Sequence, residues 1–300
     1  MNNSISIGCG KICVTYGMEE CLGELREAGY EYLDFWLCAY CDKPDRPMHQ
    51  DNWEEWVNSQ KELFASYGIK TGQCHAYWRH KNEIGEDFSW NVPLEIFRRN
   101  FEACRILGTN RLVFHPLQRW MPVDSEAVHK KVLDINAEWF GSMVRFAEDT
   151  GVEIHIENLF DHKHKCAPNN PAFPCSTADD ILYIIDKIGS PLVKTCLDTG
   201  HANIANQDIP AMIRKYGSKL GSLHLNDNYG LIGPIYEDVH LFPGFGRIEW
   251  PEVMKALAEV GYADTLNMEV IGEMSRVPRA VRLDQLKVAK AALEHFRDGI

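Results

Sequence analysis

The sequence alternates short apolar runs with longer amphipathic stretches, and this alternation occurs eight times along 300 residues. The short runs have the length of buried strands, and the longer stretches have the periodicity of helices. Strands that alternate with helices favour parallel pairing through right-handed crossovers. Eight such units close most simply into a (β/α)8 barrel. We therefore predict an α/β fold with a single TIM-barrel domain over residues 1–300.

The predicted boundaries rest on helix caps and on glycines at helix ends, such as Gly108 and Gly151. The predicted strands cover residues 4–8, 32–37, 69–74, 111–114, 152–156, 192–197, 220–225 and 265–270. The predicted helices cover residues 19–28, 53–67, 94–107, 125–150, 177–188, 209–216, 250–260 and 278–296. A doubly wound sheet is the competing fold, but the turn that starts at Gly8 lacks its glycine-rich phosphate loop.

Charge and composition indicate which kinds of binding partner and which cellular location to expect for this chain. The 31 basic and 43 acidic residues give a formal charge of −12, which argues against binding to a phosphate backbone. No apolar run approaches the ~18 residues of a membrane span, and Met1–Lys11 does not resemble a secretory signal. The ten cysteines then suggest reduced thiols in a cytoplasmic protein, and the Cys38–Cys41 pair has no second pair that would indicate a zinc site. We allow for a homo-oligomer.

Nine side chains that can bind a metal lie near the ends of predicted strands or in the following loops. They are His75, His115, Glu157, Asp198, His201, His224, Asp238, His240 and Glu269. The steps from His75 to His115, from His115 to Glu157 and from Glu157 to Asp198 are 40, 42 and 41 residues long. Each step is about one strand–helix unit. In a barrel, these positions would lie at similar heights on the C-terminal face, where active sites form. The spacing therefore predicts a metal-centred site.

Four of these side chains come from the last four predicted strands: Glu157, Asp198, His224 and Glu269. Three carboxylates and one imidazole form an oxygen-rich set that suits Mn²⁺, Mg²⁺ or Co²⁺, with Zn²⁺ as a further option. Such a metal can polarise a carbonyl group of a substrate. We expect Glu157 and Glu269 to be catalytic, one taking a proton from the carbon beside the carbonyl and the other returning it.

The other five candidates leave more alternatives open. Gly200 favours a tight turn in Asp198-Thr-Gly-His201, so His201 is expected to face the same pocket and to contact a substrate hydroxyl or a second metal. Asp238 and His240, at positions i and i+2, would hold a further metal or fix their loop. The remaining pair, His75 and His115, would add ligands that the four-ligand chemistry does not require.

Aromatic and basic residues near the strand ends are candidates for substrate contact. Trp36, Trp78, Trp120 and Phe160 can stack on a sugar ring or exclude water, although core packing explains Trp36 equally well. Arg247, together with the basic loop at residues 161–165, could receive a phosphate, although a solvated loop explains these residues better. For substrate binding we therefore predict His201, Trp120 and Arg247.

The chain resembles the sugar phosphate isomerase/epimerase superfamily of xylose isomerase-like TIM barrels. The resemblance is carried by the segments Val152-Glu-Ile-His-Ile-Glu-Asn158, Cys196-Leu-Asp-Thr-Gly-His201, Leu223-His-Leu-Asn-Asp-Asn228, 238–250 and Asn267-Met-Glu269. For ketose 3-epimerases of this group, it implies a metal on the four residues named above, an acid/base pair of two glutamates and a substrate contact from His201. Their substrate-binding arginine, six residues after the metal-binding histidine, is replaced by Gly230.

The same superfamily includes the apurinic endonucleases, which bind three zinc ions. All nine side chains named above resemble the zinc ligands of those enzymes. Two alternatives from different classes follow. We expect a divalent-metal-dependent isomerase or epimerase of a small sugar, polyol or sugar phosphate, and we keep a trinuclear zinc phosphodiesterase as the alternative. A dehydratase would begin with the same proton abstraction, and a sugar-binding barrel without activity is the non-enzymatic alternative.

Overall fold

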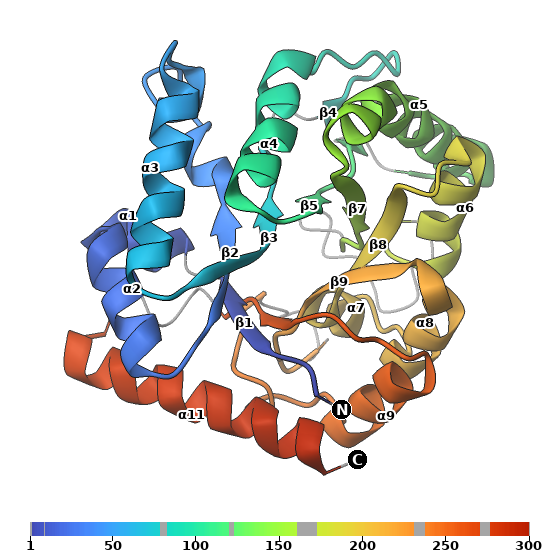
Figure 1. Cartoon of the computed structure of the whole chain (residues 1–300). Helices are drawn as coiled ribbons and strands as arrows, with labels where there is room; N and C mark the ends of the chain where they lie inside the picture. The colour runs from blue at the N-terminus through green and yellow to red at the C-terminus, as the bar shows by residue number, and fades with distance from the viewer. Residues whose placement is uncertain are drawn as a thin grey trace.

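The computed structural model describes residues 2–8, 10–78, 83–119, 123–160, 173–230, 238–270 and 277–299. Its main sheet has eight parallel strands in the order β10-β1-β2-β3-β5-β7-β8-β9 (Figure 1). The strands are β1 (Ile5–Gly8), β2 (Tyr32–Trp36), β3 (Lys70–His75), β5 (Arg111–Phe114), β7 (Glu153–Glu157), β8 (Val193–Asp198), β9 (Leu220–His224) and β10 (Leu266–Met268). The predicted parallel α/β topology is thus confirmed.

The sheet closes on itself where its first and last strands meet. The Leu225 backbone N–H donates to the Asn267 carbonyl at 2.8 Å, and the Glu269 N–H donates to the Leu225 carbonyl at 3.0 Å. These two hydrogen bonds continue the parallel ladder between β9 and β10, so the sheet forms a nearly closed barrel. The carboxyl ends of all eight strands consequently point to the same end of the barrel.

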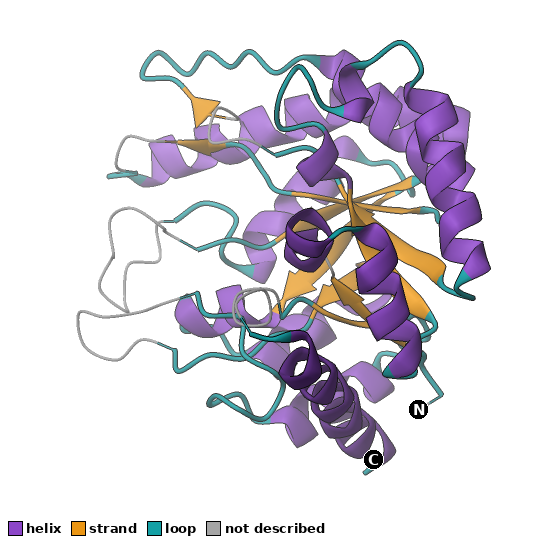
Figure 2. Ribbon diagram, turned by 90° about the vertical axis from the view of Figure 1, so that its left-hand side faces the viewer, coloured by secondary structure: helices purple, strands orange, loops and turns teal. Residues whose placement is uncertain are grey.

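Helices surround the strands (Figure 2). The α-helices are α1 (Gly10–Tyr16), α2 (Met18–Glu27), α3 (Trp53–Ser66), α4 (Leu94–Leu107), α5 (Glu126–Thr150), α6 (Ala178–Ile188), α7 (Thr199–Ile204), α8 (Ile209–Tyr216), α9 (Trp250–Glu259) and α11 (Arg279–Asp298). Short 3-10 helices cover Leu37–Tyr40, Pro47–His49 and Gly217–Lys219, and a small second sheet joins β4 (Glu83–Ile84) to β6 (Gln118–Arg119). No helix in the described ranges has the length and apolar character needed to cross a membrane.

Local sequence signals explain why the helices begin and end where they do. The Thr177 hydroxyl caps α6 by accepting the Asp180 N–H, and the Ser125 hydroxyl caps α5 in the same way from Val128. Gly151 ends α5 in the left-handed conformation, at φ 70°, which is strained for residues with a Cβ. These positions were predicted from the sequence and place the following strands as expected.

The space between the helices and the outside of the barrel is filled by large apolar side chains. Phe97, Phe101, Phe114, Trp139 and Phe140 are buried and in ring contact, which fixes α4 and α5 against β5.

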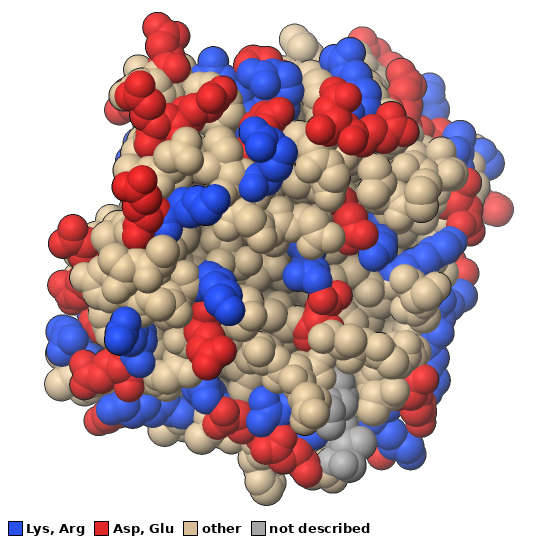
Figure 3. Space-filling view, in the orientation of Figure 1, with Lys and Arg blue, Asp and Glu red and all other residues tan. Residues whose placement is uncertain are grey.

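On the face in Figure 3, acidic and basic side chains are interspersed.

The interior of the barrel is more polar than its outer layer. Ser6, Asp34, Gln73, His155 and Asn267 are fully buried, whereas barrel interiors are usually filled by Val, Ile and Leu. Gln73 on β3 and Asn267 on β10 both donate to Asp34 on β2 at 3.1 Å, so these side chains meet across the interior. This polar layer lies directly below the strand ends that form the site.

Candidate metal centre

The nine metal-capable side chains predicted from the sequence gather into three groups. Within each group, one ligand atom per residue lies within 4.8 Å of all the others. The groups are His75, His115 and Glu157; Glu157, Asp198, His224 and Glu269; and His201, Asp238 and His240. The structure therefore brings together the nine side chains that were named from the sequence.

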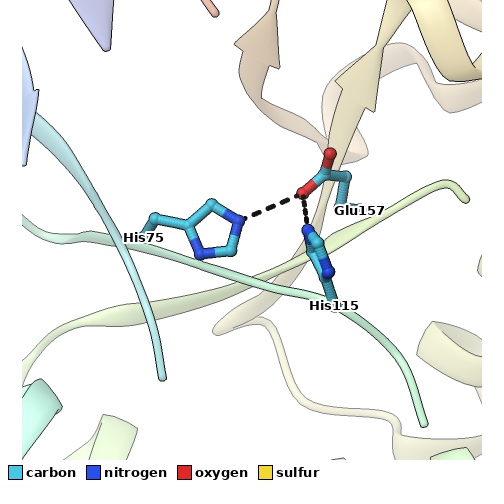
Figure 4. Close-up of side chains that lie close together, drawn as sticks. All are labelled: His75, His115 and Glu157. Carbon is cyan, nitrogen blue, oxygen red and sulfur yellow. Dashed lines mark ion pairs between the residues drawn. The ribbon is translucent and has the colours of Figure 1, made fainter. Parts of the chain in front are cut away.

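Glu157, the last residue of β7, belongs to two of these groups. Its Oε2 lies 3.5 Å from His75 Nε2 and 3.2 Å from His115 Nε2, so two histidines from different parts of the chain converge on one oxygen (Figure 4). Its Oε1 lies 3.2 Å from His224 Nδ1 and 3.4 Å from His201 Nδ1. Both oxygens of this fully buried carboxylate thus face histidine nitrogens.

His224, the last residue of β9, lies between the two glutamates that were predicted to be catalytic. Its Nδ1 is 3.2 Å from Glu157 Oε1 and 3.3 Å from Glu269 Oε2. Glu269 directly follows β10 and is only 6% exposed, while Glu157 and His224 are completely buried. The two carboxylates, one at the end of β7 and the other just after β10, therefore approach one imidazole nitrogen on β9, which is the arrangement that a shared cation requires.

Asp198 completes this group, but its local structure differs from the prediction. We expected a tight turn at Asp198–His201, and this was wrong, because residues 199–204 form helix α7. Asp198 caps this helix, its Oδ1 accepting the His201 N–H at 2.7 Å, while its Oδ2 accepts Asn226 Nδ2 at 2.8 Å. Gly200 is needed for space instead of for a turn, because a Cβ would lie 1.8 Å from Asn226 Oδ1.

Three histidines are oriented by backbone carbonyl groups. Nδ1 of His75 lies 3.0 Å from the Ala76 oxygen, Nδ1 of His201 lies 2.9 Å from the Asn158 oxygen, and Nδ1 of His240 lies 2.7 Å from the Glu269 oxygen. A carbonyl oxygen only accepts hydrogen bonds, so each Nδ1 carries a proton, and Nε2 is the nitrogen that can give its lone pair to a metal. This is the arrangement in which a histidine binds a metal through Nε2.

The third group forms where the segment that contains Asp238 and His240 meets α7. Asp238 Oδ2 lies 3.5 Å from His201 Nε2 and 3.0 Å from His240 Nε2. His240 has a φ of 46°, a left-handed conformation that costs energy for a residue with a side chain. The strained backbone turns the His240 ring toward Asp238, so the pair supplies ligand atoms to one point.

The chemistry of the donors fits a bound metal. Both oxygens of Glu157 and Nδ1 of His224 are buried without a hydrogen-bond partner, although other ligand atoms surround them. Buried polar atoms normally have partners, so atoms without partners that face one another indicate a site for a cation. Carboxylates and imidazoles together bind Mn²⁺, Co²⁺ and Zn²⁺. The residues present therefore fit a divalent metal.

The site also separates the proton affinities of its carboxyl groups. Burial alone would raise the pKa of Glu157, but the charges of His224 and His115 outweigh it and hold this pKa well below its ordinary range. Burial raises the pKa of Glu269 to about 7, against the opposing effect of His224 and His240. Burial also lowers the pKa of His115 to about 4. Without a metal, therefore, the group carries protons that an incoming cation must displace.

The family model of the xylose isomerase-like TIM barrel matches residues 22–299. The chain belongs to this family.

Curated relatives of this barrel family differ in name and in the length matched. An uncharacterized protein from Methanocaldococcus jannaschii is 29% identical over 59% of this chain and 56% of its own length. The chain thus spans a little over half of that relative. An inosose isomerase from Bacillus subtilis is 24% identical over 65% of this chain and 64% of its own. A D-psicose 3-epimerase from Enterocloster bolteae is 35% identical over 31% of this chain and 28% of its own.

Solved structures of the family superimpose on nearly the whole chain. The IOLI protein with a bound zinc atom has a TM-score of 0.72 and 18% identity, covering 98% of this chain and 99% of its own. A D-psicose 3-epimerase in the presence of D-fructose also has a TM-score of 0.72, with 16% identity, covering 98% of this chain and 99% of its own. At these identities the likeness establishes the xylose isomerase-like fold.

Three predicted aromatic residues of this barrel line the ligand groups. The ring centroid of Trp78 lies 5.1 Å from that of His115, that of Phe160 lies 5.1 Å from that of His201, and that of Trp36 lies 6.3 Å from that of His75. Trp120 lies outside the described residues. Arg247 is exposed, and its backbone N–H donates to Asp227 Oδ1 at 3.0 Å. Its role in substrate binding remains a prediction.

Residues that support the ligands were missed by the sequence reasoning. Asp34 lies beside His224, and Asn226 and Asn158 hold Asp198. One signal was available for Asp34, since it is an acidic residue within the apolar strand Tyr32-Leu-Asp-Phe-Trp36. A charged side chain in a buried strand requires a partner, and here the neighbouring side chain is the candidate metal ligand His224.

Proposed function

We propose that this protein is a divalent-metal-dependent isomerase or epimerase of a small sugar, polyol or sugar phosphate. The proposal rests on one observation: Oε1 of Glu157 and Oε2 of Glu269 both face Nδ1 of His224, at 3.2 and 3.3 Å, within a four-ligand group. Two carboxylates from β7 and from the end of β10, which are separated in the barrel by β8 and β9, can therefore reach the same bound molecule from different directions.

The residues Glu157, Asp198, His224 and Glu269 would hold Mn²⁺, Mg²⁺, Co²⁺ or Zn²⁺. The metal, when bound, polarises a substrate carbonyl and makes the adjacent C–H more acidic. One glutamate takes this proton and the other returns a proton to the same or the neighbouring carbon. Asp198 has both oxygens in hydrogen bonds with His201 and Asn226, so it is suited to holding a ligand position and not to moving a proton.

The surroundings of the site support a polyhydroxylated substrate. The rings of Trp78 and Phe160 lie beside the ligand groups and provide apolar surfaces on which the C–H face of a sugar can rest. The relatives named inosose isomerase and D-psicose 3-epimerase support a cyclic polyol ketone or a ketose as the substrate class. A dehydratase would use the same first proton transfer and would differ in losing water from the product.

Solvent-exchange experiments test the proposal. The Mn²⁺-loaded protein is incubated in D2O with D-psicose, D-fructose, D-tagatose, L-ribulose, an inosose and fructoselysine, and deuterium is located by NMR. We expect exchange at the carbon beside the carbonyl of at least one compound, and a reduction of about 10²–10⁴-fold in Glu269→Gln. Glu153→Gln, at the other end of β7, is the matched control and should retain exchange. Absence of exchange with every compound by fully loaded protein would contradict the proposal.

A second function is favoured by the three ligand groups, which together contain all nine side chains. A trinuclear zinc phosphodiesterase acting on abasic DNA would use all of them, whereas proton transfer requires only the four-ligand group. Metal analysis of protein purified without added ions separates the two functions. Three zinc ions per chain with nicking of an abasic duplex would favour the phosphodiesterase, and one ion per chain without nicking would exclude it. The formal charge of −12 favours the sugar substrate.

A further inference from the structure

Asp34 is a fully buried carboxylate inside the barrel that belongs to none of the three ligand groups. Its Oδ2 accepts a hydrogen bond from Gln73 Nε2 at 3.1 Å and another from Asn267 Nδ2 at 3.1 Å. The same oxygen lies 3.3 Å from His224 Nε2. Because amide N–H groups can only donate, Oδ2 acts as an acceptor toward both of them, and it faces His224 as an acceptor as well.

This contact places a carboxylate on the side of His224 that faces away from Glu157 and Glu269. When a cation lies between His224 and the two glutamates, Nδ1 gives its lone pair to the cation and Nε2 keeps the proton, which faces Asp34 Oδ2 as its acceptor. Nδ1 is also the nitrogen that faces Glu157 and Glu269 at 3.2 and 3.3 Å. His224 would therefore bind the metal through Nδ1, whereas the carbonyl contacts of His75, His201 and His240 leave Nε2 as the ligand atom.

The support of His224 also differs in kind from that of the other three histidines. Their second nitrogens face backbone carbonyl oxygens, which no side-chain substitution removes. His224 instead faces a side chain, and that side chain is itself fixed by Gln73 and Asn267 from two other strands. The tautomer and ring orientation of His224 thus depend on a carboxylate that one substitution can change.

We propose that Asp34 is a positioning residue that holds His224 with its Nδ1 directed at the metal. The inference rests on the proposed function only in that the four-ligand group binds a metal. Asp34 belongs to none of the three ligand groups, so it would act through His224 and not as a ligand itself. Outer carboxylates of this kind typically change metal affinity by about 10–100-fold when they are removed.

The decisive variant is Asp34→Asn. It keeps the size of the side chain, exchanges one carboxylate oxygen for an amide NH2 group and removes the negative charge. Affinity for Zn²⁺ is measured by competition with a chromophoric chelator, and the ligand field is followed through the visible absorption of bound Co²⁺. We expect Zn²⁺ binding to weaken about 10–100-fold and the Co²⁺ spectrum to change. Affinity within twofold of the wild type, together with an unchanged Co²⁺ spectrum, would overturn the inference.

Glu153→Gln is the matched control, because Glu153 also pairs with a buried histidine of the barrel, His155, at 3.0 Å but touches no ligand. It should leave both readouts unchanged. If Asp34→Asn does not fold, Asn267→Ala replaces it, since losing one donor to Asp34 should weaken Zn²⁺ binding less but in the same direction. Wild-type protein that binds no metal would contradict the proposed function, whereas equal binding by wild type and Asp34→Asn would contradict this inference alone.

Discussion

Strand β7 carries a glutamate at each end, and the two glutamates have different neighbours. Glu153, at the N-terminal end, lies 3.0 Å from His155 Nε2 and 2.8 Å from Lys194 Nζ. Glu157, at the C-terminal end, is paired with histidines: His75, His115, His201 and His224. Arg111 and Asp264 form a further ion pair beyond the strand starts. The N-terminal end therefore balances its charge with a lysine, whereas the C-terminal end gathers the histidines with which we propose that it binds a cation.

The comparison shows that the same residue types serve stability or chemistry according to their neighbours. A lysine supplies a permanent positive charge, so Glu153 has a satisfied partner at neutral pH. A histidine supplies a lone pair when it is neutral, so several histidines around one carboxylate make a metal site. The presence of Lys194 at one end and of histidines at the other is thus the difference that matters.

The largest expected effect is that of metal on stability. At a metal concentration of about 1,000 times Kd, binding should raise the free energy of unfolding by about 4 kcal/mol. Glu157→Gln should remove most of this increase, because Glu157 belongs to two ligand groups. Glu153→Gln should retain it. Thermal unfolding with and without Zn²⁺ measures both, and an equal metal-dependent increase in the two variants would remove the distinction between the barrel ends.

An intermediate effect is expected from filling the space beside His155. A Cβ at Gly221 would lie 2.6 Å from the His155 ring, in the barrel interior. We expect Gly221→Ala to lower the free energy of unfolding by about 1–3 kcal/mol through overpacking, without a change in metal content. Gly141→Ala is the control, since Gly141 lies in α5 with no atom within 4 Å of its added Cβ, and it should be neutral or stabilising. Chemical denaturation and metal analysis would show whether this part of the barrel is purely structural.

The smallest effect is a pH dependence at the N-terminal end. Burial opposes ionisation of Glu153, but His155 and Lys194 outweigh it and lower its pKa to about 2. A lowered pKa means that the contribution is complete above the unfolded value of about 4.5 and is lost as the pH falls through about 2. We expect Glu153→Gln to cost on the order of 1 kcal/mol at pH 7 and nothing near pH 2. Denaturation at several pH values measures this difference, and a constant cost across the range would show that packing, not charge, is responsible.

Most of the fold and of the ligand set could be predicted from the sequence because both depend on strong local patterns. The strand that ends at Glu157 is predicted by its run of apolar residues, and the helix that follows Thr177 is predicted by its capping residue and its periodicity. The spacing of one strand–helix unit then places His115, Glu157 and Asp198 at one end of the barrel. No side-chain contact had to be known for these predictions.

The parts that were missed depend on contacts between distant residues. Gly200 reads as a turn residue in the sequence, but it lies in α7 and leaves room for Asn226. Asp34 meets His224 across the barrel, from positions 190 residues away in the chain. Local patterns carry no information on such pairs, so the outer support of a site is harder to predict than its ligands.

If both ligand groups that share Glu157 bind a cation, their occupancies must be mutually dependent. Each of its oxygens faces a different group, so a cation held on one side draws electron density from the carboxylate that the other side uses. Thermodynamic linkage requires the influence to be reciprocal: whatever factor the first ion imposes on the affinity for the second, the second imposes on the first. Binding isotherms for such a pair should be fitted with an interaction constant, because two independent constants would misstate both.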